Sequence, residues 1–375
     1  YLLLCTFIFM FVLMVSSCAS GSNGGNVSVR HSVYRIYDVD DLFEFANRVN
    51  SGESSLNAVL MNDIDLRDKK TDALIGATCE QSYSGVFDGR GFTIRGLNIS
   101  VVVPTGRQPD TSLFYSTSKA LFGYIHNAEI KNLNVSGKVH CHGYQFDCAG
   151  IVGDSARSRI INCQFDGIVK NSSDNGHISG ICAFAADSVI EQCTNKASVV
   201  SSVMGNTAGI VAFARDSLID KCVNDAAVTY IGEISGDMGE SIGGIGGEIR
   251  DSTIRECVNN GTVNRTGYST LAHVVGIGGI VGSVDMDKAY KKSLVINSTN
   301  KADVTGHDHV GGIAGVIQTK NKVEQCKNYG HIVVTMKAPS TENPAFYGDI
   351  YGYCKEEDNT PYYDGPYDVE DPYDR

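Results

Sequence analysis

The sequence predicts an all-β fold: a right-handed single-stranded parallel β-helix, which is a solenoid, with an N-terminal capping helix. One pattern returns at least six times: Gly-Ile or a close variant, a connecting segment, a β-branched residue, two polar residues and Cys, then Val or Ile six residues after the Cys. Successive copies lie 29 to 35 residues apart. A repeat of this size indicates one structural unit stacked on itself. The copies begin at Gly150, Gly180, Gly209, Gly244, Gly279 and Gly312.

Composition and spacing exclude the other repeat folds. The repeats show no sustained 3.6-residue apolar stripe, which excludes helical repeats. Leucine-rich repeats are shorter and have a Leu pattern that is missing here, whereas propeller blades are longer. Val, Ile, Thr, Asn and Ser dominate the copies, as short strands and turns require. Hydrophobic content is 42% and charged content is 20%, which suffices for a folded body and argues against general disorder.

Residues 1–17 have the composition of a lipoprotein-type signal peptide. Residues 2–15 are uncharged and almost wholly apolar, which is short for a membrane span but suits the core of a secretory signal. Val15-Ser16-Ser17-Cys18 resembles a bacterial lipobox, so we expect lipidation at Cys18 and a flexible tether over residues 18–31. Both this interpretation and its alternative export the protein. The alternative is an ordinary signal peptide, cut near Ser17, Ala19 or Ser20.

Residues 32–120 are expected to hold the N-terminal cap and the first coils. Residues 32–36 are expected to form an edge strand. The pattern of residues 38–49 predicts a short amphipathic helix with Asp38 at its N-cap. A solenoid needs a cover over its first open coil, and such a helix provides one; a packing helix without a capping role is the alternative. The residues that share its apolar face are Leu42, Phe45, Ala46 and Val49.

The segments on either side of the repeats carry local signals. Residues 58–66 alternate apolar and polar in their second half, as a half-buried strand does. Asp88-Gly89-Arg90-Gly91 predicts a tight turn between two short strands. Residues 121–352 are expected to hold the repeats, and the first, degenerate copy has Leu133 in the Cys position. Residues 353–375 form an acidic segment that we expect to be disordered, with calcium or partner binding as the alternative.

Twelve cysteines in an exported chain would ordinarily indicate disulfides, but one repeated position argues for stacking instead. If each copy is one coil, the side chains at this position form a single inward column at the strand spacing of about 4.8 Å, with Cys as a small apolar filler. The column consists of Cys163, Cys193, Cys222, Cys257, Ser298 and Cys326. The Ser supports a requirement for size rather than for pairing, and a disulfide ladder is the alternative. Pairing stays open for Cys79, Cys141, Cys148, Cys182 and Cys354.

A second column lies two residues after the first. Asn tolerates left-handed backbone at a corner, and stacked amides bond to one another along the axis. We therefore predict a structural Asn ladder, with a catalytic or glycan-binding role as the alternative. Phe165 takes this place in the first full copy, so that coil is expected to turn differently. The ladder consists of Asn195, Asn224, Asn259, Asn300 and Asn328.

β-Helices also host polysaccharide lyases and hydrolases, which gather acidic, basic or metal-binding groups on one face of neighbouring coils. Asp187, Asp216 and Asp251 recur six residues before the Cys position, each followed by Ser. Such Asp-Ser pairs are expected to be turn residues that bond their own backbone. A carboxylate cleft is the alternative.

Two short His-containing segments have the residue types of metal sites. His140-Cys141-His142 with Cys148 would suit zinc, but no second close pair is nearby, and half-exposed strand residues are expected instead. His307-Asp308-His309 is expected to be a loop. The sequence therefore predicts no catalytic residues, no metal site and no cofactor.

The net charge and the long loops indicate which class of partner is disfavoured and where a partner could bind. The formal net charge is -12 and the chain has no basic stripe, which disfavours nucleic acid. Two long insertions, 229–241 and 285–292, interrupt the repeats. Loops on a rigid stack are common binding sites, and plain tolerance of insertion is the alternative.

Several of these segments resemble a known family. Ala208-Gly209-Ile210-Val211 and Cys326-Lys327-Asn328-Tyr329-Gly330, with the residues around them, resemble GLUG-type repeats. Phe87-Asp88-Gly89-Arg90-Gly91-Phe92 resembles the segment that commonly precedes them. The resemblance covers residues 33–335 and implies a β-helix in an exported bacterial surface protein, without catalytic residues to carry over. Ala183 and Ala212 depart from the Gly that the family often has after the first strand.

Together these observations predict a non-enzymatic protein of the cell surface or outer membrane, held by a lipid anchor. Its β-helix would display loops for adhesion or ligand binding, and its partner would be a host or matrix protein or a glycan. Two alternatives stay open. One is a β-helix polysaccharide lyase or hydrolase, and the other is a non-catalytic module of a larger surface protein or protease.

Overall fold

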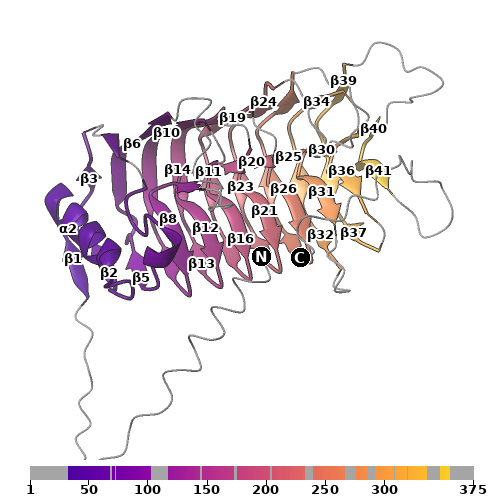
Figure 1. The fold of residues 1–375 in the computed structure, drawn as a ribbon. Coiled ribbons are helices and arrows are strands. Elements are labelled where there is room, and N and C mark those ends of the chain that lie inside the picture. The colour runs from indigo at the N-terminus through magenta and orange to yellow at the C-terminus, as the bar shows by residue number, and fades with distance from the viewer. Residues whose placement is uncertain are drawn as a thin grey trace, which may run out of the picture. The chain divides into compact units, whose positions relative to one another are not determined.

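The chain of this computed structural model winds into coils that stack along one axis (Figure 1). Each strand pairs in parallel with the like strand of the next coil. All described residues lie in one compact unit, Ser32–Glu357. The structure describes residues 33–67, 70–71, 73–102, 117–143, 146–172, 175–202, 205–232, 240–266, 276–285, 292–307, 309–318, 320–335 and 347–354.

Four parallel sheets, here named A to D, form the walls of the stack. A full coil passes through sheets A, B, D and C in turn before it returns to A. Sheet A contains β1 (Tyr34–Ile36), β2 (Ala58–Leu60), β5 (Val86–Asp88), β9 (Glu129–Lys131), β13 (Arg159–Ile161), β17 (Val189–Glu191), β22 (Leu218–Asp220), β27 (Thr253–Arg255), β32 (Leu294–Ile296) and β37 (Lys322–Glu324).

Sheet B is the longest wall. It contains β3 (Ile64–Asp65), β4 (Lys70–Thr71), β6 (Thr93–Val102), β10 (Asn134–His142), β14 (Gln164–Asn171), β18 (Thr194–Asn195), β19 (Ser198–Ser201), β23 (Val223–Asn224), β24 (Val228–Tyr230), β28 (Val258–Asn259), β29 (Val263–Arg265), β33 (Thr299–Asn300), β34 (Val304–Gly306), β38 (Lys327–Asn328) and β39 (Ile332–Val334).

Sheets C and D complete each coil. Sheet C contains β8 (Phe122–His126), β12 (Val152–Ala156), β16 (Cys182–Ala186), β21 (Val211–Arg215), β26 (Gly246–Arg250), β31 (Val281–Asp285), β36 (Ala314–Ile317) and β41 (Tyr351–Cys354). Sheet D contains β7 (Thr117–Lys119), β11 (Phe146–Ala149), β15 (Ile178–Ser179), β20 (Thr207–Ala208), β25 (Ser241–Gly243), β30 (Gly276–Gly278), β35 (Val310–Gly311) and β40 (Tyr347–Gly348). The predicted parallel β-helix is thereby confirmed.

The core runs the length of the stack as one continuous cluster. The β-branched residue of each repeat stands at the centre of a sheet A strand, in register with its equivalents and fully buried, as Ile160, Ile190 and Ile219 illustrate. The Val six residues after the Cys is likewise buried and stands in register with its equivalents in sheet B. Parallel sheets are normally covered on their apolar face, and here the opposite walls of the coil cover one another.

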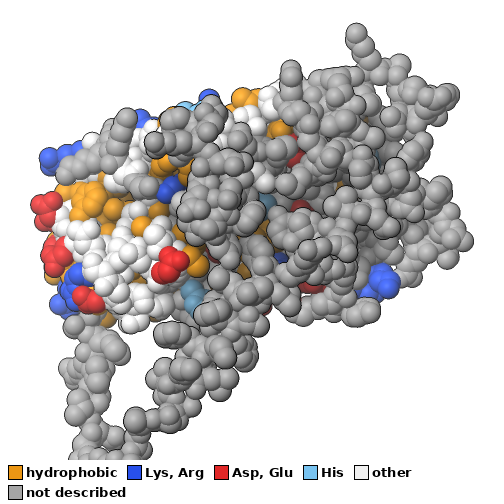
Figure 2. All heavy atoms as spheres, in the orientation of Figure 1, with side chains coloured by type: hydrophobic (Ala, Val, Ile, Leu, Met, Phe, Trp, Pro, Cys, Tyr) orange, Lys and Arg blue, Asp and Glu red, His pale blue; other side chains and the backbone are white. Residues whose placement is uncertain are grey.

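The helix α2 (Val39–Asn50) covers the first coil. Its N-cap is Asp38, whose side chain accepts the N–H groups of Asp40 and Asp41 at 3.0 Å. Its buried residues are the four predicted ones, and the Phe45 ring lies 5.8 Å from that of Phe87 in the coil below. Figure 2 shows acidic and basic side chains gathered at this end of the stack, where the helix faces solvent. The predicted capping helix is therefore present.

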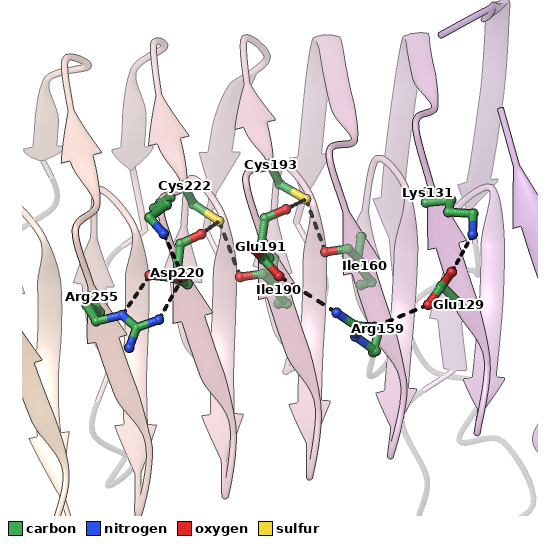
Figure 3. A network of polar contacts seen from close by, with 11 residues as sticks. Glu129, Lys131, Arg159, Ile160, Ile190, Glu191, Cys193, Asp220, Cys222 and Arg255 are labelled. Carbon is green, nitrogen blue, oxygen red and sulfur yellow. Dashed lines mark hydrogen bonds and ion pairs between the residues drawn. The ribbon is translucent and has the colours of Figure 1, made fainter. Parts of the chain in front are cut away.

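The Cys column is an inward row at the corner between sheets A and B. The first four thiols and Ser298 are buried, whereas Cys326 of the last repeat is partly exposed. Each thiol donates both to a carbonyl of its own coil and to one of the preceding coil, as Cys193 does to Glu191 and Ile160, both at 3.4 Å (Figure 3). The described cysteines, including Cys79, Cys141, Cys148 and Cys182, are free thiols, and the Cys354 side chain lies outside the described residues.

The Asn column forms a ladder of amides. The first four donate from Nδ2 to Oδ1 of the next Asn at 2.7–2.8 Å, and the last, Asn328, donates to Asp349 at 2.8 Å. Each Asn also donates to the carbonyl two residues further on. A Gly of the Gly-Ile pair faces each amide: a Cβ added at Gly209 would overlap Asn224, and one at Gly244 would overlap Asn259. The recurring Gly is thus a consequence of the Asn ladder.

The left-handed backbone expected at the Asn positions is wrong, whereas the bonding of stacked amides is present. The left-handed residue is the one directly before the Cys column, as at Asn162 (φ 50°), Gln192 (φ 54°) and Lys221 (φ 52°), whereas the ladder Asn residues have ordinary strand backbone. The different course expected at Phe165 is present, since β14 runs unbroken there and later coils divide the same path into two strands.

The tight turn predicted at Asp88–Gly91 is present between β5 and β6, where the N–H of Phe92 donates to the carbonyl of Gly89 at 2.8 Å. It forms a corner of the coil, because β5 belongs to sheet A and β6 to sheet B. Residues 58–66 likewise contain two strands of those same sheets, β2 and β3, rather than a single strand. A run of alternating residues gives no sign of where a solenoid bends.

The Cys column supplies a stability test. Cys222→Asp should lower the free energy of unfolding by about 3–5 kcal/mol, because it places an unpaired charge in the core. Cys222→Ser should have a small effect, because Ser298 already occupies an equivalent place and donates to Ile296. Urea unfolding of both variants measures the difference, and near-native unfolding of the Asp variant would contradict an inward column.

Candidate functional site at the corner of sheets C and D

The recurring acids of the repeat are turn residues. Asp187, Asp216 and Asp251 adopt left-handed backbone with φ of 48–50° at the corner between sheets C and A. Short polar residues such as Asp tolerate this conformation better than most. The described geometry assigns them to the corner, in keeping with the turn interpretation rather than a carboxylate cleft.

The Ser that follows each of these acids forms a third ladder, which the sequence interpretation missed. The N–H of Ser188 donates to Oγ of Ser217 at 3.0 Å, and Ser217 does the same to Ser252. Each hydroxyl also donates to a carbonyl two residues back, as Ser217 does to Arg215 at 2.7 Å. The sequence carries a signal for this ladder, because Ser recurs five residues before the column position, but the same Ser residues also fit turn chemistry.

The His-containing segments do not assemble a metal centre among the described residues. In β10, His140 and His142 are half-buried on the outer side, while Cys141 between them is buried in the core beside Cys148. His142 is within 3.0 Å of Ser172 through Nδ1. His307 and His309 each lie in a bend between β34 and β35, and Asp308 lies outside the described residues. These groups hold the wall together and converge on no common point.

The outer face of sheet A carries a network of ion pairs (Figure 3). Glu129 accepts from Lys131 at 2.6 Å and from Arg159 at 3.4 Å. Arg255 forks onto both oxygens of the buried Asp220 at 2.9 Å, and this bond holds the pKa of Asp220 below its usual range. The acids and bases of this face are paired across neighbouring coils, which suits a structural network.

A different kind of surface lies at the corner between sheets C and D, where residues six or seven positions apart in the sequence come together from the two sheets. We call it the C–D seam. On sheet C it is formed by the aligned residues Tyr124, Asp154, Phe184, Phe213, Glu248 and Ser283. On sheet D it is formed by Ser118, Asp147, His177, Asn206 and Ser241.

Hydrogen bonds join the two rows of the C–D seam. The N–H of Ser118 donates to the hydroxyl of Tyr124 at 3.1 Å. Asn206 donates from Nδ2 to Glu248 at 3.0 Å, and Ser241 bonds to Ser283 at 2.7 Å. The two rows therefore face one another along the stack, and they vary in chemistry from coil to coil where the three ladders do not.

Aromatic rings occupy the middle of the seam. Phe184 and Phe213 stack at a centroid distance of 5.2 Å and an angle of 12°. The His177 ring lies 5.5 Å from Phe213, and the Arg250 guanidinium lies over the same ring at 5.4 Å. His177 accepts the N–H of Asn206 through Nδ1 at 3.4 Å.

Two acids stand beside this stack. Asp147 is buried and accepts the N–H of His177 at 2.8 Å. Burial, followed by the charge of Asp147, raises the pKa of Asp154 to about 7. Burial and the charge of Asp154 raise the pKa of the Cys79 thiol, which lies at the rim of the same corner. Titratable groups shifted by burial and by one another are typical of functional sites.

The seam also contains buried polar atoms that are not satisfied. Ser118 Oγ and Asn206 Oδ1 belong to side chains that are at most 3% exposed, and neither atom has a hydrogen-bond partner. Such atoms are rare and costly. Each lies in the sheet D row, facing sheet C.

The insertion at 229–241 is anchored by a buried cluster on sheet B. Glu240 accepts from the Tyr230 hydroxyl at 2.9 Å, and the Arg265 guanidinium lies 5.8 Å over the Tyr230 ring. Burial raises the pKa of Glu240 to about 7. Of the insertion itself, residues 233–239 lie outside the described residues, as do residues 286–291 of the second one.

Comparisons with known proteins give distant similarities. No known sequence family matches the chain, and no curated protein matches it. Among solved structures, it is similar to a Bacteroides ovatus protein provisionally named an immunoglobulin A1 protease, with 17% identity and a TM-score of 0.48 over 86% of this chain and 84% of that one. A second structure, named IgA1 Protease, has 14% identity and a TM-score of 0.48 over 87% of this chain and 26% of its own. No described helix has the length and apolar character of a membrane span.

Asp154 gives the protein a specific pH dependence. Its folded-state pKa of about 7 exceeds the ordinary value of 3.8, so the folded protein keeps a proton that the unfolded chain has lost. The free energy of unfolding should therefore fall as the pH rises from about 4 to about 7. Asp154→Asn should remove part of this slope, and Glu240 should contribute the part that remains with the same sign.

Urea unfolding at about pH 5 and about pH 8 measures this effect. The matched control is Asp166→Asn, which removes the same charge from an exposed position of β14. An equal slope in wild type and Asp154→Asn would show that Asp154 titrates normally.

Proposed function

We propose that this chain is an exported, non-enzymatic cell-surface protein whose β-helix presents the C–D seam to a host or matrix protein or a glycan. The observation that carries the proposal is the composition of the seam. Stacked rings, two carboxyl groups and unsatisfied buried acceptors lie on one strip, at positions where a purely structural column would repeat one residue type. Binding surfaces use aromatic anchors with a few placed polar groups in this way.

The stack suits display. The coils that carry Asn195 to Asn328 are fixed to one another by backbone bonds and by three side-chain ladders, so their seam residues keep a constant spacing. A preorganised surface loses little conformational entropy on binding. Several polar groups of the seam are also tied to one another, since Glu248 accepts from both Arg250 and Asn206. This interlocking favours a recognition surface over a catalytic centre.

A polysaccharide hydrolase is the second candidate, and one observation favours it. Asp154 has a raised pKa and stands near a second acid, Asp147. A pair of carboxyl groups with different protonation states is the arrangement of acid–base glycosidases. Release of sugars from a polysaccharide by wild type, but not by Asp154→Asn, would establish this activity in place of display.

The cellular location belongs to the same proposal. The apolar leader, the lipobox ending at Cys18 and the resemblance to GLUG-type repeats support an exported protein with a lipid anchor. A non-catalytic module of a larger surface protein is compatible with the same seam.

A binding screen tests the function. Residues 33–354 would be applied to a glycan array and to a panel of matrix proteins. Phe184→Ala should abolish binding of whichever ligand is found, because it removes the stacked ring of the seam. The control is Tyr329→Ala, which removes an aromatic ring that is 66% exposed at a distant corner. Equal loss in both variants, or in neither, would contradict a role for the seam.

Metabolic labelling tests the anchor. The full chain with its leader should incorporate a palmitate analogue when it is expressed in a bacterium, and Cys18→Ala should abolish the label. Cys5→Ala, within the apolar leader, should keep it. Labelling that survives in Cys18→Ala would support ordinary signal cleavage instead.

A further inference from the structure

Tyr124 and Phe184 are the two rings that flank Asp154 on sheet C. Asp154 pairs in register with Tyr124 of the coil before it and with Phe184 of the coil after it. Strands in a sheet lie about 4.8 Å apart, so the backbones of Tyr124 and Phe184 stand about 9.6 Å apart, with Asp154 between them. A cation held midway between rings that project from these two positions would lie within the range of about 6 Å for a cation over an aromatic face.

The strand position between the two rings is acidic. Burial and the neighbouring charge of Asp147 disfavour ionisation of Asp154, and neither a cation nor a hydrogen bond offsets them. Asp147 belongs to the adjacent row on sheet D, which also holds Ser118. The Ser118 hydroxyl lies beside Gly153, the residue before Asp154, and has no hydrogen-bond partner.

The second unsatisfied atom of the seam also requires a hydrogen-bond donor. Asn206 Oδ1 accepts no hydrogen bond, while its Nδ2 is already used on Glu248. A carbonyl oxygen has only acceptor capacity, so the missing partner is a donor. Carboxyl groups, an acceptor and aromatic faces together match a flat, charged donor of several N–H groups.

We propose that the C–D seam binds the side chain of an arginine or lysine of a partner protein, inserted between Tyr124 and Phe184 and paired with Asp154 and Asp147. This inference rests on the proposed function and names the chemistry of its partner. The formal net charge of -12 favours approach of a basic partner. Arginine fits best, because its planar fork pairs with carboxylates and stacks on rings at the same time.

Such binding depends on pH. The groups that face Asp154 are Asp147 from β11, Tyr124 from β8, Cys79 from the 3-10 turn at Cys79–Gln81, and Cys182, buried beneath it in β16. Lys119 of β7 lies near Asp147 over the Phe146 ring. A bound cation favours the ionised form of Asp154, so a proton leaves on binding. The dissociation constant should rise by up to about tenfold for each pH unit below the pKa of Asp154.

The test uses small probes and the described unit, residues 33–354. Nα-acetyl-arginine methylamide is titrated into the protein while ring signals are followed by NMR. The matched probe is Nα-acetyl-citrulline methylamide, which has the same shape without the charge. We expect the arginine probe to bind at about pH 8, at least tenfold more tightly than the citrulline probe, and to weaken at about pH 6.

Variants locate the site. Asp154→Asn should weaken the arginine probe at least tenfold and remove its pH dependence, Phe184→Leu should weaken it severalfold, and Asp166→Asn should leave it unchanged. Thermal melting establishes that each variant is folded. Absence of binding to wild type, equal binding of the citrulline probe, or an unaffected Asp154→Asn would each overturn the inference. A glycan that binds through Phe184 while the arginine probe does not would overturn the inference and leave the proposed function standing.

Discussion

The structure depends on how each coil turns between sheets A and B without leaving buried polar groups unpaired. Asn224 meets this requirement in one coil: its amide bonds to the coil on either side and to the carbonyl of Ala226. The amide fits only because Gly209, on the opposite wall, has no side chain. Buried backbone and amide groups are costly when unpaired, so Gly and Asn recur together.

The ladders share a single mechanism. In each one, a side chain bonds to its own coil and to a neighbouring one, as the Cys193 thiol does to Glu191 and Ile160. Stability in such a stack is carried between neighbours rather than by a central nucleus. The ladders therefore restrict which residue types can occupy the inward and corner positions of a coil. The outward positions can vary.

The C–D seam is an outward region in which the residue types vary from coil to coil. Sheets C and D meet there. Outward residues of the two sheets lie side by side, although the buried Gly-Ile corner separates them along the chain. Asp154 stays protonated up to about pH 7 in this environment, which lowers stability at neutral pH. A carboxyl kept at such a cost beside Phe184, in a seam that also holds the unsatisfied Oδ1 of Asn206, is typical of a site shaped for binding.

The sequence by itself determined the fold class, the capping helix and the stacking of like residues, because a repeat of fixed length with β-branched residues fits few architectures. It did not determine that Asp88–Gly91 is a corner, nor that left-handed backbone precedes the Cys position, as at Gln192. Local patterns report which residues are buried, but not the angle at which one wall meets the next. Only the tertiary structure decided that Asp147 and Asp154 face one corner, because that angle follows from the packing of whole coils.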